Sequence, residues 1–216
     1  MKEPSHWDVY LVTDRGLSRG RTTAEIVEAA VSGGVSVVQL REKGLETRAF
    51  YEEGLKIVDF LRFRGIPLII NDRLDIALAL DADGVHLGRD DMPLAVARRI
   101  LGPEKIIGIS INTSDHINEE AVRLADYLAV SPVFFTGTKE DITTPWELEG
   151  VKRARSLTDL PLVGIGGINR ENAADAVSAG IDCVAVVSAI VSADDPEEAT
   201  RDLKDRVRSA KRVRMG

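Results

Sequence analysis

Short runs of apolar, mostly β-branched residues recur eight times along the chain, and each is followed by a stretch with helical spacing of its apolar positions. The runs are nearly continuous rather than alternating, which is typical of strands buried on both faces of a sheet. They predict strands over residues 9–14, 36–41, 67–71, 84–88, 105–110, 127–133, 161–166 and 183–189.

The stretches between the runs predict helices over residues 22–31, 46–63, 74–80, 93–101, 118–125, 147–156, 169–179 and 196–213. Eight strand–helix units in 216 residues indicate an α/β protein, namely a single (β/α)8 TIM barrel that spans residues 1–216. A doubly wound sheet is the rival fold, but the first turn, residues 14–17, lacks a dinucleotide-binding glycine pattern.

Polar residues follow the predicted strands at the point where each strand ends. A parallel barrel brings all these ends to one face, which is where such barrels carry their active sites. The clusters are residues 39–43, 71–72, 88–91, Ser110, residues 136–139, residues 166–167 and Ser188. Cations, carboxylates and glycine-rich turns would therefore share one pocket, whose chemistry indicates magnesium and phosphates.

Two carboxylates, Asp72 and Asp91, follow neighbouring predicted strands. Adjacent strand ends lie about 5 Å apart, and Mg²⁺ prefers one or two carboxylates together with water and phosphate oxygens. We therefore predict a Mg²⁺ site at these residues. Each aspartate alone would also suit a helix N-cap.

The cations of this face lie in two places. Arg41 and Lys43 alternate with Glu42, so both can point to the pocket. Lys139 lies in an irregular stretch over residues 134–146, which we interpret as a lid that closes on a leaving group. At the ends of the last two strands, Gly166-Gly167 and Ser188 predict a phosphate site, although glycines there also serve tight turns.

Charge and composition limit the partners. A formal net charge of −7 argues against nucleic-acid binding, and the apolar runs are too short to span a membrane. The end of the chain is basic, and we expect the polar face of a last helix followed by a frayed tail over about residues 205–216.

The single cysteine, Cys183, lies in an apolar run and is compatible with a reducing cytoplasm. Of the three histidines, His86 is predicted in the core or pocket wall, and His6 and His116 at the surface.

These motifs together resemble the thiamine-phosphate synthase family. The resemblance covers nearly the whole chain and is carried by residues 10–14, 38–43, 70–73, 83–88 with Asp91, 136–139, 165–168 and 186–190. It implies a transferase that joins 4-amino-2-methyl-5-hydroxymethylpyrimidine diphosphate to a thiazole phosphate, carboxylated or plain, and yields thiamine phosphate and diphosphate.

The resemblance also implies roles for individual residues. Asp72 and Asp91 would bind Mg²⁺. Arg41, Lys43, Lys139 and Ser110 would be catalytic, while the substrate-binding set comprises Gln39, Leu40, Arg41, Glu42, Lys43, Asn71, Ser110, Thr136, Gly137, Thr138, Lys139, Gly167, Val187 and Ser188. Thr136, Thr138, Gly167, Val187 and Ser188 would take the thiazole phosphate.

Two positions depart from the family pattern. Asn112 stands where a histidine is common, and Arg89 where glutamine is common. Alternatives on the same barrel are a thiazole tautomerase, a noncatalytic phosphate-sensing regulator and a phosphosugar isomerase. The predicted Mg²⁺ ligands and the nearby cations argue against the first two. The third would require a clear acid–base pair, which the sequence does not show. The sequence leaves a homo-oligomer open.

Overall fold

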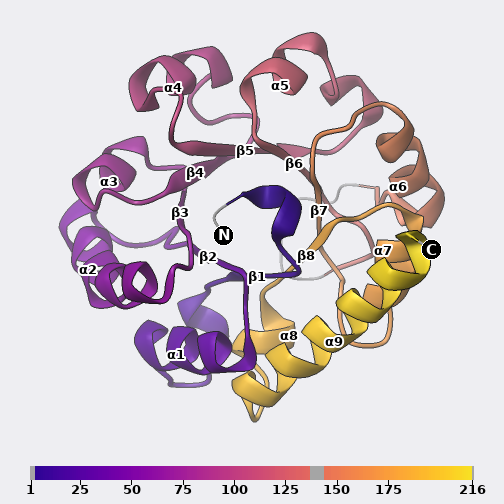
Figure 1. Ribbon diagram of the computed structural model, residues 1–216. Helices are drawn as coiled ribbons and strands as arrows, with labels where there is room; N and C mark the ends of the chain where they lie inside the picture. Colours follow the sequence, from indigo (N-terminus) through magenta and orange to yellow (C-terminus); the bar gives the residue numbers. More distant parts are fainter. Residues whose placement is uncertain (1–2, 137–143, 216) are drawn as a thin grey trace.

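The computed structural model describes residues 3–136 and 144–215, and within them eight parallel strands close into a barrel (Figure 1). The strands are β1 (Val9–Val12), β2 (Val37–Leu40), β3 (Leu68–Asn71), β4 (Gly84–Leu87), β5 (Ile106–Ile111), β6 (Tyr127–Val130), β7 (Leu162–Ile165) and β8 (Cys183–Val186). Each strand pairs with its neighbour in the chain, and β8 pairs with β1, with Ala185 opposite Tyr10. The predicted TIM barrel is thus confirmed.

Helices form a ring around the barrel (Figure 1). They are α1 (Thr23–Gly33), α2 (Thr47–Arg64), α3 (Leu74–Ala79), α4 (Leu94–Leu101), α5 (Glu119–Leu124), α6 (Glu147–Ser156), α7 (Ala173–Ala179), α8 (Ser188–Val191) and α9 (Pro196–Met215). Short 3₁₀ helices precede β1, follow β1 and follow β5, namely η1 (Pro4–His6), η2 (Arg15–Leu17) and η3 (Ser114–His116). None of the helices in the described part of the chain has both the length and the apolar character needed to cross a membrane.

Some element bounds differ from the prediction. The helix predicted over residues 169–179 begins only at Ala173, because Asn169 accepts a hydrogen bond from the N–H of Glu171 and Asn172 accepts one from the N–H of Asn169. Such side-chain turns compete with helix formation. The strand predicted over residues 183–189 ends at Val186, because Ser188 already starts α8.

The interior of the barrel is filled by three large aromatic side chains together with aliphatic ones. The rings of Trp7, Tyr10 and Tyr127 meet edge to face, with centroids 5.4 to 6.1 Å apart. Gly108 of β5 makes room for one of them, because a Cβ added there would lie 1.9 Å from Cζ of Tyr127. Cys183 is a buried free thiol in the same cluster. The larger apolar core lies between the barrel and its helices.

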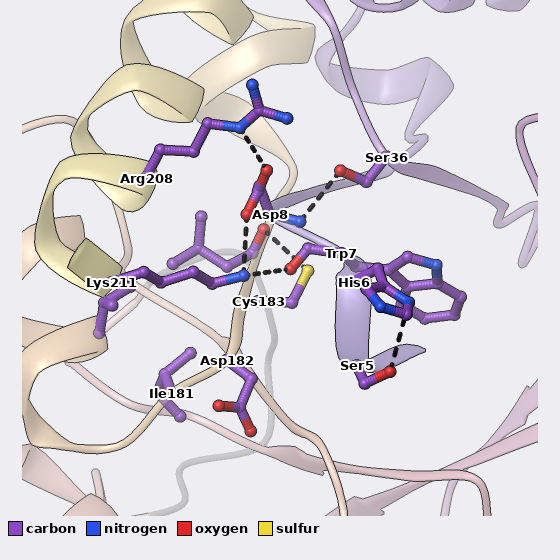
Figure 2. A network of polar contacts seen from close by, with 12 residues as sticks. Ser5, His6, Trp7, Asp8, Ser36, Ile181, Asp182, Cys183, Arg208 and Lys211 are labelled. Carbon is purple, nitrogen blue, oxygen red and sulfur yellow. Dashed lines mark hydrogen bonds and ion pairs between the residues drawn. The ribbon is translucent and has the colours of Figure 1, made fainter. Parts of the chain in front are cut away.

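The segment before β1 contacts the last helix, α9, at the barrel opening opposite the carboxyl ends of the strands. The N-terminal segment lies across this opening (Figure 1), and Asp8 is held between two basic residues of α9 (Figure 2). Its Oδ2 accepts from Nε of Arg208 at 2.7 Å and its Oδ1 from Nζ of Lys211 at 2.8 Å. Lys211 also donates to the carbonyl oxygen of Trp7. The frayed tail expected over about residues 205–216 is therefore replaced by a helix that continues to Met215, because its basic residues find buried acceptors.

Candidate active site

The carboxyl ends of the strands surround a cavity of about 1190 Å³. All eight strands or the loops that follow them contribute to its wall. Of the residues predicted for the site, it is lined by Gln39, Arg41, Lys43, Asn71, Asp72, Asp91, Ser110, Thr136, Gly167, Val187 and Ser188. Residues spread over 150 positions therefore share one space, as the barrel topology requires.

Other predicted residues lie elsewhere. Leu40 is fully buried in the core outside the barrel, because successive side chains of a strand point to opposite faces. Glu42 borders a separate hollow of about 330 Å³ next to η2. Burial raises the pKa of Glu42 to about 7, and the neighbouring carboxylates Glu53 and Asp14 act in the same direction, opposed by nearby arginines. Gly137, Thr138 and Lys139 lie outside the described residues.

Asp72 and Asp91 face each other in the cavity. Burial raises the pKa of Asp72 to about 6, helped by a hydrogen bond with the Asp91 carboxyl group and by its charge, and opposed by Lys43 and Asn71. Asp72 directly follows β3 and lies in the left-handed region, with φ of 63°, and its N–H donates to the carbonyl oxygen of His86 at 2.9 Å. Strained backbone of this kind often accompanies function, and here it brings the carboxylate to the cavity.

This pair fits the requirements of Mg²⁺. The two carboxylates disfavour each other's charge, and a divalent cation between them would relieve that cost. Within residues 3–136 and 144–215 no cluster of three or more acidic, histidine or cysteine side chains is arranged around a metal position. Two carboxylates without further protein ligands suit Mg²⁺, which usually keeps several waters and binds substrate phosphates.

The two cations Arg41 and Lys43 differ in how their side chains are held. Nη1 of Arg41 donates to Oδ2 of Asp14 at 3.0 Å, and about a fifth of each side chain is exposed. The backbone N–H of Arg41 donates to Oγ1 of Thr13 at 3.0 Å. Lys43 is exposed, and its charge lowers the pKa of Asp72. Arg41 is therefore preorganised, while Lys43 is an exposed positive charge beside the carboxylate pair.

Glycines at the end of β7 allow two loops to touch. Gly166 and Gly167 have φ of 96° and 68°, and a Cβ at Gly166 would lie 2.6 Å from Cβ of Pro132. At Gly167 an added Cβ would lie 2.6 Å from the carbonyl oxygen of Phe135. Close packing alone therefore requires glycine at both positions. The same turn adjoins Val187 and Ser188 in the cavity wall.

Sequence reasoning placed one polar residue of the cavity poorly. His116, expected at the surface, lines the cavity, where its Nδ1 accepts from the N–H of Asn112 at 3.0 Å. Burial lowers the pKa of His116, and the charge of Arg89 lowers it further. The side chain of Asn112 donates to the carbonyl oxygen of Ser131 at 2.9 Å. The turn in η3 that brings the ring back to Asn112 carries no clear sequence signal.

His86 is both core and cavity wall, the two alternatives predicted for it. Its Nε2 lies 2.9 Å from Oγ of Ser110 and its Nδ1 lies 3.0 Å from Oη of Tyr127. Tyr10 and Tyr127 also reach the cavity floor, and sequence reasoning did not select them. Their positions within strands could have indicated this, because a tyrosine that points into the barrel buries a hydroxyl group, and that hydroxyl needs a hydrogen-bond partner.

Comparison with known proteins agrees with the fold and the shared motifs. The family model described as thiamine monophosphate synthase matches residues 9–190. The thiamine-phosphate synthase of Chloroflexus aurantiacus is 50% identical over 198 residues, covering 92% of this chain and 91% of the relative. That of Moorella thermoacetica is 47% identical over 205 residues, covering 95% and 98%.

Among solved structures, thiamine phosphate pyrophosphorylase from Pyrococcus furiosus superposes with a TM-score of 0.87 at 36% identity, covering 96% of this chain and 98% of that one. The similarity thus extends over both chains and includes the strand ends that build the cavity. The chain belongs to the thiamine monophosphate synthase family and is a transferase of thiamine biosynthesis.

Proposed function

We propose that the chain condenses 4-amino-2-methyl-5-hydroxymethylpyrimidine diphosphate with a thiazole phosphate, carboxylated or plain, to give thiamine phosphate and diphosphate, with release of CO2 when the thiazole is carboxylated. The observation that carries this proposal is the carboxylate pair of Asp72 and Asp91 in one cavity with Arg41 and Lys43. This combination suits a polyanionic leaving group, which needs both a metal and fixed positive charge.

The proposed reaction begins with departure of the diphosphate. The bond between the ring methylene carbon and the diphosphate oxygen breaks, and the oxygen keeps the electron pair. The remaining cation is stabilised by the aminopyrimidine, and the thiazole nitrogen then supplies the electron pair of the new C–N bond. No nucleophilic side chain is required, so the protein acts by binding and electrostatics.

Charge on the departing oxygens is where the side chains act. Arg41, held by Asp14, presents its remaining N–H groups in a fixed orientation, and Lys43 can follow the leaving group. Lys139 would add a third positive charge. Asp72 and Asp91 are the residues that would hold Mg²⁺, which when bound neutralises charge on the diphosphate oxygens. These contacts strengthen as charge develops and therefore favour the transition state over the ground state.

The remaining cavity residues would position the two rings. Gln39, Asn71 and Ser110 would contact the pyrimidine diphosphate. The thiazole phosphate would be bound by Thr136, Gly137, Thr138, Gly167, Val187 and Ser188. Leu40 and Glu42 are left out of the proposed contacts, because neither lines this cavity.

The experiment is an assay with both substrates and Mg²⁺ that follows diphosphate and thiamine phosphate. We expect the two products in equal amounts and little diphosphate when the thiazole phosphate is omitted. Diphosphate release that does not depend on the thiazole would indicate hydrolysis and contradict the proposal.

A thiazole tautomerase remains a second candidate, because two histidines, His86 and His116, line the cavity. It is tested by incubating the carboxylated thiazole phosphate alone. Conversion of one tautomer into the other without the pyrimidine, together with no coupled product in the first assay, would favour this candidate.

A further inference from the structure

A continuous chain of side-chain hydrogen bonds crosses the interior of the barrel. Nε2 of Gln39 donates to Oη of Tyr10 at 2.8 Å, and that hydroxyl lies 3.0 Å from Oη of Tyr127. The Tyr127 hydroxyl lies 3.0 Å from Nδ1 of His86, whose Nε2 lies 2.9 Å from Oγ of Ser110. Five strands contribute one residue each, and both ends of the chain line the cavity.

The direction of one bond determines the direction of the others, because each hydroxyl carries one proton. Tyr10 accepts from the amide of Gln39, so its own proton goes to Tyr127, the other polar neighbour of that hydroxyl among the described residues. Tyr127 then donates to Nδ1 of His86. The neutral ring carries its proton on Nε2 and donates to Ser110.

The two ends of the chain consequently have opposite character. Ser110 accepts from His86, so its own proton is left for a ligand in the cavity. The side-chain amide of Gln39 gives one N–H to Tyr10, so its Oε1 is left as an acceptor. Turning the Gln39 amide over would reverse every bond, making Ser110 the acceptor and Gln39 the donor.

The surroundings keep this chain intact. Tyr10 and Tyr127 are each no more than 1% exposed, and Trp7 packs against both rings. Burial raises the pKa of both phenols, which therefore keep their protons. Since water has little access, loss of one hydroxyl would leave its partners unpaired.

We propose that Tyr10, Tyr127 and His86 are positioning residues that couple Gln39 to Ser110. The coupled ends select a ring that offers a hydrogen-bond donor to one end and an acceptor to the other, as an aminopyrimidine does. This inference rests on the proposed function only for the identity of the ring. The coupling itself is a property of the protein without ligand.

Ligand selectivity gives the first test. Calorimetry compares binding of the 4-aminopyrimidine diphosphate and of its 4-oxo analogue, in which an acceptor replaces the amino donor, with no thiazole phosphate present. The parent should prefer the amino ring at least tenfold. Tyr127→Phe and Tyr10→Phe should lose most of that preference, because the Gln39 amide can then turn independently of Ser110. Tyr51→Phe, a change of the same kind on α2, should keep it.

A purely structural role for the tyrosines would weaken binding of both rings by the same factor, and that result would overturn the proposal.

The second test needs no ligand. Nitrogen NMR of labelled histidine, assigned with His86→Gln, should show the Nε2–H form of His86 in the parent and an altered signal in Tyr127→Phe.

The second test also separates this inference from the proposed function. If the parent binds neither pyrimidine but His86 carries its proton on Nε2 and responds to Tyr127→Phe, the proposed function fails and the coupling stands. An unchanged signal in Tyr127→Phe would refute the coupling whatever the ligand, whereas a proton on Nδ1 in the parent would indicate the reversed chain and refute the direction assigned here.

Discussion

Replacement of Asp91 by asparagine should make the protein slightly more stable and much less active. The asparagine side chain would keep an oxygen that can accept from the N–H of Gly88, which Oδ2 of Asp91 does at 2.6 Å, so the loop should remain in place. The substitution removes a negative charge that disfavours ionisation of Asp72. It also removes one of the two carboxylates proposed to hold the metal.

The expected gain in stability follows from the pKa of Asp72. The difference between its ordinary value of 3.8 and about 6 in the folded chain corresponds to about 3 kcal/mol, and partial solvent screening reduces this to about 1 kcal/mol. Because the folded pKa is raised, this group favours folding below about pH 4, and that contribution is lost as the pH rises through about 6. At pH 8 without metal, relief of up to about 1 kcal/mol raises Tm by about 2 °C in a chain of this size.

Calorimetry at pH 8 and pH 5, each with chelator or with Mg²⁺, measures this effect. Without metal the variant should melt higher than the parent at pH 8, and the difference should shrink at pH 5, where Asp72 of the parent is mostly protonated and the two carboxylates no longer repel each other. Mg²⁺ should stabilise the parent more than the variant. Turnover should fall on the order of 10²- to 10³-fold, as when other preorganised electrostatic contacts are removed.

The matched control is Asp159→Asn, which removes the same charge from an exposed residue that does not line the cavity. It should change neither Tm nor turnover appreciably. If Asp91→Asn melted lower than the parent at pH 8 without metal, the two carboxylates would not oppose each other. If its turnover matched that of the parent, Asp91 would have no role in binding the metal.

Three further changes test other parts of the structure. Burial alone would raise the pKa of Asp8, but its basic partners on α9 lower it from 3.8, so its stabilisation is present above about pH 4 and lost at lower pH. Asp8→Asn should lower the free energy of unfolding by about 2 kcal/mol, or Tm by about 4 °C, at pH 7; an equal loss at pH 3 would contradict this reasoning. Gly108→Ala should cost about 1–3 kcal/mol in urea unfolding, because the added methyl group meets the ring of Tyr127; parent-like stability would mean that the ring moves freely. Lys139→Ala should lower turnover and leave KM for the thiazole phosphate nearly unchanged, whereas a large rise in that KM at normal turnover would contradict its role at the leaving group.

The fold was predictable because it repeats. Buried parallel strands give continuous apolar runs, and eight such runs separated by helices have few other solutions. The same topology brings Asp72 and Asp91 to one cavity without knowledge of any side-chain conformation. Alternation along β2 separates Gln39 and Arg41, which line the cavity, from Leu40, which faces the helices. The family motif over residues 38–43 includes Leu40 in the predicted site. The alternating direction of side chains along a strand would have excluded it from the cavity.

Contacts between distant side chains were not predictable. Tyr10 and Tyr127 meet across 117 positions, and their meeting depends on strand register and on the space that Gly108 leaves. The return of His116 to the cavity depends on the turn in η3, which has no periodic signal. The order of α9 to its end likewise depends on ion pairs with two residues distant in sequence, Asp8 and Asp182.

The most direct test of the account is the position of the metal with the leaving group. Crystals soaked with Mn²⁺, which replaces Mg²⁺, and with diphosphate should show one anomalous peak at about 2.1 Å from oxygens of both Asp72 and Asp91, with the diphosphate between that ion and Arg41. A metal bound to the diphosphate away from both carboxylates would contradict the account.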